Sequence, residues 1–228
     1  AASASRALVP TTSSMDLARC RYIVVEGPIG AGKTSLARQI AEHLDAEMLL
    51  EQPEDNPFLS RFYDDMARFA LPTQLTFLFQ RADQLRELAQ LDMFRQPTVS
   101  DFLLDKDPLF ARINLTDVEY ALYEKVFKHL KPQTAVPDLV IYLQAPVDTL
   151  VSRVRMRGIP FEQAVPDDYL ARIADAYARF FYQYDEAPTL IINSERLNFV
   201  DNPAHMKLLL DRVAGMRARR EFFNLGQG

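Results

Sequence analysis

The chain has 228 residues, 48% of them hydrophobic and 25% charged, which suits one globular domain. Its 26 Lys and Arg against 31 Asp and Glu give a formal charge of -5, and we expect no nucleic-acid partner, because proteins that coat nucleic acids carry a basic surface. One cysteine argues against an internal disulfide, and with three separated histidines it argues against a zinc site. No apolar run approaches the roughly 20 residues of a membrane span, so we expect no membrane partner and a cytoplasmic location.

Residues 1–20 are rich in Ala, Ser and Thr, and we expect a disordered tail before a single domain at 21–228. Short runs of β-branched and apolar residues predict buried strands at 22–25, 48–50, 98–100, 139–143 and 189–192. Apolar residues at helical spacing predict helices at 36–44, 58–69, 75–85, 118–130 and 170–181. Strands that alternate with helices indicate an α/β fold, here a five-stranded parallel sheet flanked by helices.

A glycine-rich turn follows the first predicted strand. Its sequence, GPIGAGKT at residues 27–34, is a full match to the phosphate-binding pattern G-x-x-x-x-G-K-[ST]. Glycines let backbone amides approach phosphate oxygens, Lys33 would reach the terminal phosphates, and the Thr34 hydroxyl would ligate Mg²⁺. The alternative is a turn that only joins a strand to a helix, but three of the seven glycines fall in this segment. We expect ATP to bind Gly27, Pro28, Ile29, Gly30, Ala31, Gly32, Lys33, Thr34 and Ser35.

A phosphate loop alone does not distinguish a switch, a motor and a kinase. The sequence lacks an Asn-Lys-x-Asp guanine signature. Arg153, Arg155 and Arg157 stand on a predicted helix that runs into Gly158, and such a cluster can neutralise the oxygens of a transferred phosphoryl group. The alternative is a solvated helix face that pairs with acidic neighbours. We favour a P-loop kinase fold with an arginine-rich lid.

Several spaced motifs carry a resemblance to a known family. The first two are the phosphate loop and the string LLEQP at 49–53, which contains Glu51. The others are Tyr63 and Gln74 at the spacing that family members show, Phe110 in LFA at 109–111, and the lid string 153–162, which ends at Glu162. Over roughly residues 22–210 the chain resembles the deoxynucleoside kinase family, and within it the bacterial deoxyadenosine and deoxyguanosine kinases.

The resemblance implies transfer of the γ-phosphoryl group of ATP, with Mg²⁺, to the 5′-hydroxyl of a deoxynucleoside, purines preferred, by a homodimer. Lys33 and the lid arginines would hold the phosphates, so that catalysis is mostly positioning and charge stabilisation. The acceptor roles it implies are Glu51 as base, Tyr63 and Glu162 on the sugar 3′-hydroxyl, Gln74 on the base edge and Phe110 stacked on the base. Without the resemblance, Glu51 is an ordinary loop acid, Gln74 a helix-start residue, and the two aromatics are core residues.

Two positions depart from the family pattern. Members commonly have Glu-Arg-Ser after the third strand, and here Asp101 stands at the position of the arginine. Asp101 is either a Mg²⁺ ligand or an acceptor for a donor on the base. Ile159 stands where many members have another lid arginine. Other functions stay open: a deoxycytidine- or thymidine-preferring kinase, a thymidylate-type monophosphate kinase, or a non-catalytic ATP-binding module.

Overall fold

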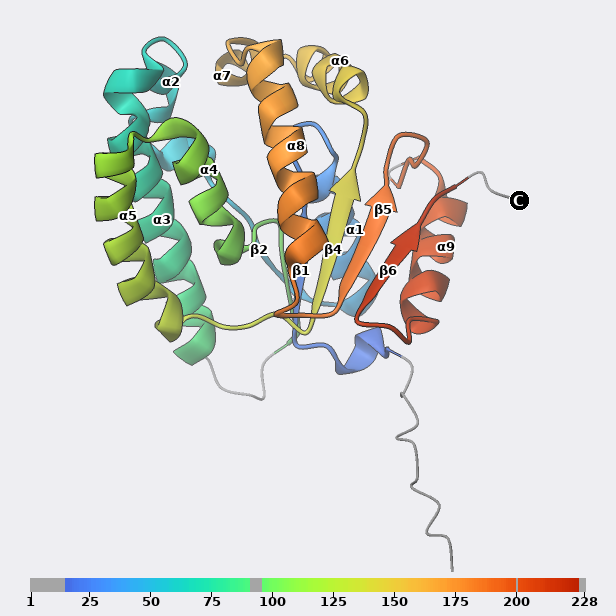
Figure 1. Ribbon diagram of the computed structural model, residues 1–228. Coiled ribbons are helices and arrows are strands. Elements are labelled where there is room, and N and C mark those ends of the chain that lie inside the picture. The colour runs from blue at the N-terminus through green and yellow to red at the C-terminus, as the bar shows by residue number, and fades with distance from the viewer. Residues whose placement is uncertain (1–14, 91–95, 200, 226–228) are drawn as a thin grey trace, which may run out of the picture.

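The computed structural model describes residues 15–90, 96–199 and 201–225 (Figure 1). In this part of the chain, six parallel strands form one sheet in the order β2-β3-β1-β4-β5-β6. The strands are β1 (Tyr22–Glu26), β2 (Glu47–Leu49), β3 (Thr98–Ser100), β4 (Leu139–Gln144), β5 (Thr189–Asn193) and β6 (Arg220–Phe223). The helices are α1 (Lys33–Leu44), α2 (Leu59–Phe62), α3 (Met66–Gln90), α4 (Asp107–Asn114), α5 (Asp117–Leu130), α6 (Val147–Arg157), α7 (Pro160–Gln163), α8 (Asp167–Gln183) and α9 (Pro203–Ala214). Short 3₁₀ helices are η1 (Leu17–Arg19), η2 (Pro53–Asp55), η3 (Leu104–Lys106) and η4 (Lys131–Gln133).

Helices cover both faces of the sheet (Figure 1). The core under α3, α4, α5 and α8 is one cluster of buried side chains, and the core under α1 and α9 is another. Successive strand residues point to opposite faces, so Val24 of β1 belongs to the first cluster, and Ile23 and Val25 belong to the second. Burial on both faces explains why the central strands read as unbroken apolar runs.

The prediction of a parallel sheet flanked by helices is confirmed, but the predicted number of strands is wrong. The five predicted strands are β1 to β5, with ends shifted by one residue at most. The sixth strand, β6, extends the sheet by pairing Arg220 with Thr189 of β5. Its sequence, REFF, mixes charged and apolar residues that are half-buried or exposed at the sheet edge. It therefore lacks the apolar run by which the other strands are recognised.

The helix predicted at 58–69 is wrong as a single element. α2 ends at Phe62, and α3 begins four residues later at Met66. The Asp65 carboxylate accepts a hydrogen bond from the Arg68 backbone N–H at 3.3 Å, as a residue that caps a helix start does. Apolar residues of both helices pack against the same core cluster, so the helical spacing of apolar residues continues through the turn. The sequence pattern therefore does not show the break.

The tail predicted at 1–20 is too long at its far end. Residues 15–20 contact the domain: Met15 N–H donates to the Met216 carbonyl at 3.3 Å, and Cys20 is 4% exposed. Residues 1–14 of the predicted tail lie outside the described residues. Among the helices that the structure describes, none is both long enough and apolar enough to cross a membrane.

Candidate active site

The phosphate loop joins β1 to α1 at the end of the sheet to which the strand arrows point (Figure 1). Gly30 and Gly32 have φ of 86° and 94°, the left-handed region that glycine adopts most readily. A Cβ on Gly30 would lie 2.8 Å from the Leu150 carbonyl oxygen, so this glycine also permits a close approach of two backbones. Gly32 is the N-cap of α1, and the free amides of a helix start favour an anion.

A cavity of about 580 Å³ adjoins the loop. The predicted site residues that line it are Ile29, Gly30, Gly32, Lys33, Thr34, Ser35, Glu51, Tyr63, Gln74, Asp101, Phe110, Arg153, Arg157 and Glu162. Gly27, Pro28, Ala31 and Arg155 are predicted site residues that are not part of this lining. The fold therefore brings the phosphate loop and all the predicted acceptor-side residues around one space.

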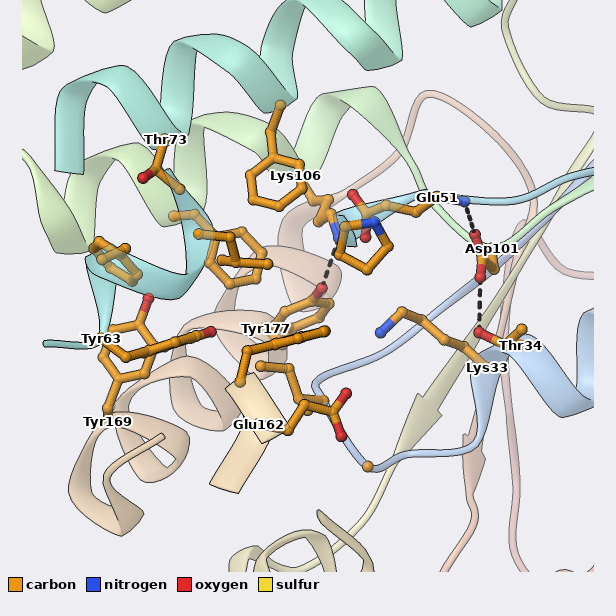
Figure 2. Close-up of a pocket in the computed structure, with 18 of the residues that line it drawn as sticks. Lys33, Thr34, Glu51, Tyr63, Thr73, Asp101, Lys106, Glu162, Tyr169 and Tyr177 are labelled. Atoms are coloured by element: carbon orange, nitrogen blue, oxygen red, sulfur yellow. Dashed lines mark hydrogen bonds between the residues drawn. The ribbon is translucent and has the colours of Figure 1, made fainter. Parts of the chain in front are cut away.

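Lys33, Thr34 and Asp101 form the phosphate end of the cavity (Figure 2). The Thr34 hydroxyl donates to Asp101 Oδ2 at 2.7 Å, and the Glu51 backbone N–H donates to Asp101 Oδ1 at 2.8 Å. Within the described residues, the Lys33 ammonium has no hydrogen bond or ion pair, and burial and the nearby Lys106 ammonium lower its pKa. Three carboxylates lie near enough to attract Lys33, and an anionic ligand would supply the direct ion pair that it lacks among the described residues.

A buried ion network holds Glu51 at the centre of the cavity. The Arg81 guanidinium of α3 donates to the Glu51 carboxylate, through Nε at 2.7 Å and through Nη2, and it pairs with Asp107 through Nη1. Gln74 Nε2 donates to Asp107 Oδ1 at 3.0 Å. Burial alone would raise the pKa of Glu51, but Arg81 and two neighbouring lysines outweigh it and lower this pKa to about 2. Glu51 is therefore a carboxylate at neutral pH.

Two buried oxygens at the cavity wall have no hydrogen-bond partner in the described structure, Thr73 Oγ1 and Glu162 Oε2. The other Glu162 oxygen pairs with Arg157 at 3.4 Å, and burial raises the Glu162 pKa. Nearby, the Tyr63 ring packs edge-on against Tyr169 with centroids 6.3 Å apart (Figure 2). Because buried polar atoms normally have partners, these oxygens mark places where a ligand can form hydrogen bonds.

An aromatic wall lies beside this network. Phe110 of α4 meets Tyr177 of α8 edge-to-face, with ring centroids 5.9 Å apart. Lys106 Nζ lies 5.1 Å from the centre of the Phe110 ring and pairs with Glu26 at 2.7 Å. A flat ring beside hydrogen-bonding groups such as Gln74 suits a planar heterocycle, which can stack on the ring while its edge is bonded.

The lid arginines have different surroundings. The predicted helix is confirmed as α6, which ends at Arg157. Arg153 and Arg157 line the cavity. Arg155 donates to the carbonyls of Gln163 and Val165 at 2.8 and 2.9 Å, and so joins α6 to the segment that contains α7. A phosphate contact for Arg155 stays a prediction, and these bonds support a structural role.

Three charged residues of the site were not predicted: Arg81, Lys106 and Asp107. Arg81 stands three residues after Leu78 and four before Leu85, so a charge occupies the apolar face of the predicted helix. A charge on such a face indicates a buried residue with a charged partner. Lys106 and Asp107 are 2% and 0% exposed. Their burial depends on contacts between elements far apart in the chain, so the sequence around residues 106 and 107 does not predict it.

A family model described as deoxynucleoside kinase matches residues 23–216. The chain belongs to the deoxynucleoside kinase family. The deoxyguanosine kinase of Bacillus subtilis (strain 168) is 31% identical over 197 residues, which cover 84% of this chain and 95% of the relative. The deoxyadenosine kinase of Lactobacillus acidophilus is 32% identical over 207 residues, covering 85% and 94%.

A solved structure of deoxyadenosine kinase from M. mycoides, with dCMP and dCDP bound as products, superimposes with a TM-score of 0.75 at 25% identity. The match covers 86% of this chain and 100% of that one. Together these similarities confirm the predicted family, the kinase fold and the reaction class, a phosphotransferase with an alcohol acceptor.

In this deoxynucleoside kinase, Gly30→Ala should destabilise the fold more than Gly32→Ala. Both substitutions place a side chain at positive φ, at a cost of about 1–2 kcal/mol. Only the Cβ at Gly30 meets another group, the Leu150 carbonyl, whereas a Cβ at Gly32 has nothing within 4 Å. Urea unfolding of the two variants measures the difference. Equal losses of unfolding free energy would show that the loop does not need the close approach at Gly30.

Proposed function

We propose that the chain is an ATP- and Mg²⁺-dependent kinase that phosphorylates the 5′-hydroxyl of deoxynucleosides, preferring purines, in nucleotide salvage. The observation that carries this proposal is that the phosphate loop and the ion network around Glu51 line the same cavity. One end of this space offers an unpaired ammonium for phosphates, and the other offers hydrogen-bonding groups and an aromatic wall for a nucleoside.

Thr34 and Asp101 are the residues that would hold Mg²⁺. Their oxygens are 2.7 Å apart at the loop, and hard oxygen donors are what Mg²⁺ prefers. Among the described residues no group of three or more His, Cys, Asp or Glu could hold a metal, which fits an ion bound by few protein ligands together with phosphates and water. When bound, the ion would neutralise charge on the phosphates. The position of Asp101 at Thr34 supports the metal role over contact with the base.

Glu51 would accept a hydrogen bond from the acceptor hydroxyl and orient it toward the terminal phosphate. Its lowered pKa makes it a weak base, so alignment of the hydroxyl is the larger part of its contribution. Phosphoryl transfer suits such an arrangement, because its loose transition state depends on positioning more than on deprotonation of the nucleophile. Arg81 keeps the carboxylate in place while leaving one edge of it to the cavity.

The base of the nucleoside would stack on Phe110, with its edge toward Gln74 and Arg81. Gln74 Nε2 donates to both the carboxylate and the backbone carbonyl of Asp107, and the Gln74 carbonyl oxygen is left as an acceptor. Arg81 uses three of its five N–H groups on the two carboxylates. The remaining acceptor and donors match the mixed donor and acceptor edge of a purine. Glu162 and Tyr63 would bind the sugar 3′-hydroxyl. Two relatives named for deoxyguanosine and deoxyadenosine support the purine preference.

ATP turnover against a panel of acceptors tests this function. We expect turnover with deoxyguanosine or deoxyadenosine above that with deoxycytidine, thymidine, ribonucleosides and dTMP, and none in the Lys33→Ala variant. Turnover on dTMP alone would move the chain to the monophosphate kinases. Bound ATP without turnover on any acceptor would favour a non-catalytic module. A cytoplasmic location stays a prediction.

Glu51→Gln should lower kcat by about 10²-fold, because the amide cannot take a proton and is a weaker acceptor than a carboxylate. The affinity for ATP should change little, because Glu51 faces the acceptor. Steady-state kinetics with the preferred deoxynucleoside and ATP titration of the same sample measure both. Unchanged turnover would remove Glu51 from the reaction.

We also propose a homodimer formed through α3 and α5, which lie side by side (Figure 1). Phe79 of α3 and Val118 and Leu122 of α5 are 45%, 82% and 51% exposed, although they are large apolar side chains. Light scattering should give twice the 26.1 kDa chain mass, and Leu122→Glu should give the monomer. Leu208→Glu, on α9, is the matched control and should stay dimeric. A wild-type monomer would refute the proposal.

A further inference from the structure

Lys106 is a buried cation in the active-site cavity. It is 2% exposed and lines the cavity wall where η3 meets α4. Its ammonium pairs with Glu26 at 2.7 Å and donates to the Tyr177 hydroxyl at 3.1 Å. These are its two hydrogen-bonding partners among the described residues, and an ammonium has three N–H groups. One N–H of a side chain that lines the cavity is therefore left without a hydrogen-bond acceptor among the described residues.

Glu26 does not need Lys106 to satisfy its hydrogen bonds. It also accepts from the Gly27 N–H at 2.7 Å, the Leu103 N–H at 3.1 Å and the Tyr177 hydroxyl at 3.0 Å. A carboxylate with three such donors is already well stabilised, and a buried ion pair is by itself weak evidence for a stabilising role.

The position of Lys106 adds to this argument. Figure 2 shows its side chain reaching toward the space between Tyr177 and Glu51, with the Lys33 side chain extending toward that space from the loop. Lys106 and Lys33 are close enough to repel each other, and Lys106 also attracts the Glu51 carboxylate. Two ammonium groups therefore face the junction between the phosphate end and the acceptor end.

We propose that Lys106 is a further catalytic residue, whose free N–H donates a hydrogen bond to the phosphoryl group as it passes to the acceptor. The inference rests on the proposed kinase function. In the transfer, the acceptor oxygen bonds to the γ-phosphorus while the bond from that phosphorus to the bridging oxygen breaks. ADP leaves with the electron pair, and the hydroxyl proton passes through Glu51 to solvent. Lys106 only donates a hydrogen bond, from the acceptor side, opposite Lys33.

Lys106→Met tests the role, because methionine keeps an unbranched apolar chain and removes the charge. We expect kcat to fall by about 10²–10³-fold, the typical effect of removing one donor to a transition state. Tyr177→Phe is the matched comparison: it removes the hydroxyl that bonds both Glu26 and Lys106, and it keeps the aromatic ring and the cation. It should lose less than about tenfold in kcat, an effect that reports the structural part of the cluster.

Calorimetric binding of product and substrate separates catalysis from structure. Lys106→Met should weaken binding of the deoxynucleoside 5′-monophosphate at least tenfold, while the affinity for the parent deoxynucleoside changes little. A wild-type kcat, or equal loss of affinity for both ligands, would overturn the proposal. If Lys106→Met does not fold, Lys106→Gln keeps a neutral donor to Glu26 and allows the same two measurements. A wild-type chain inactive on every acceptor would refute the kinase function itself, which is a different outcome.

Discussion

The site depends on the buried carboxylate of Glu26 at the end of β1. It accepts hydrogen bonds from the first amide of the phosphate loop, from Leu103 after β3 and from Tyr177 of α8, and it pairs with Lys106. A carboxylate buried at this depth without hydrogen-bond donors would cost several kcal/mol, so the groups that donate to it are fixed together. One charge thereby sets the start of the loop relative to η3 and to the aromatic wall.

The local parts of the site could be read from the sequence because their signals are local. A β-branched run, GPIGAGKT and an amphipathic repeat lie in consecutive residues, and each has a direct conformational cause. The glycines at 30 and 32 indeed take positive φ, and Lys33 begins α1. The exposed edge strand β6 and the turn between α2 and α3 were not predicted correctly, because burial at an edge and a reversal of the chain leave little trace in apolar spacing.

The acceptor end was identified only through a family resemblance, and the reason is physical. Gln74, Glu51 and Phe110 come from three elements and acquire their surroundings when α3, the segment after β2 and α4 pack together. Arg81 and Asp107 join them and were missed, although a charge on the apolar face of α3 pointed to a buried partner. A motif predicts the local structure and chemistry of one segment, whereas a buried ion network forms only when several segments pack together.

The distribution of charge also argues for the kind of acceptor. At the acceptor end, Arg81 is neutralised by Glu51 and Asp107, and Lys106 is paired with Glu26, so the charges of these buried cations are already balanced. At the phosphate end, Lys33 makes no direct hydrogen bond or ion pair among the described residues, although carboxylates lie near it. Polyphosphate therefore suits the phosphate end, and an uncharged, hydroxyl-bearing ligand suits the acceptor end, since an anion placed there would meet the Glu51 carboxylate. This separation favours a nucleoside over a nucleotide as acceptor, and it follows from ion pairing that the fold imposes before any ligand binds.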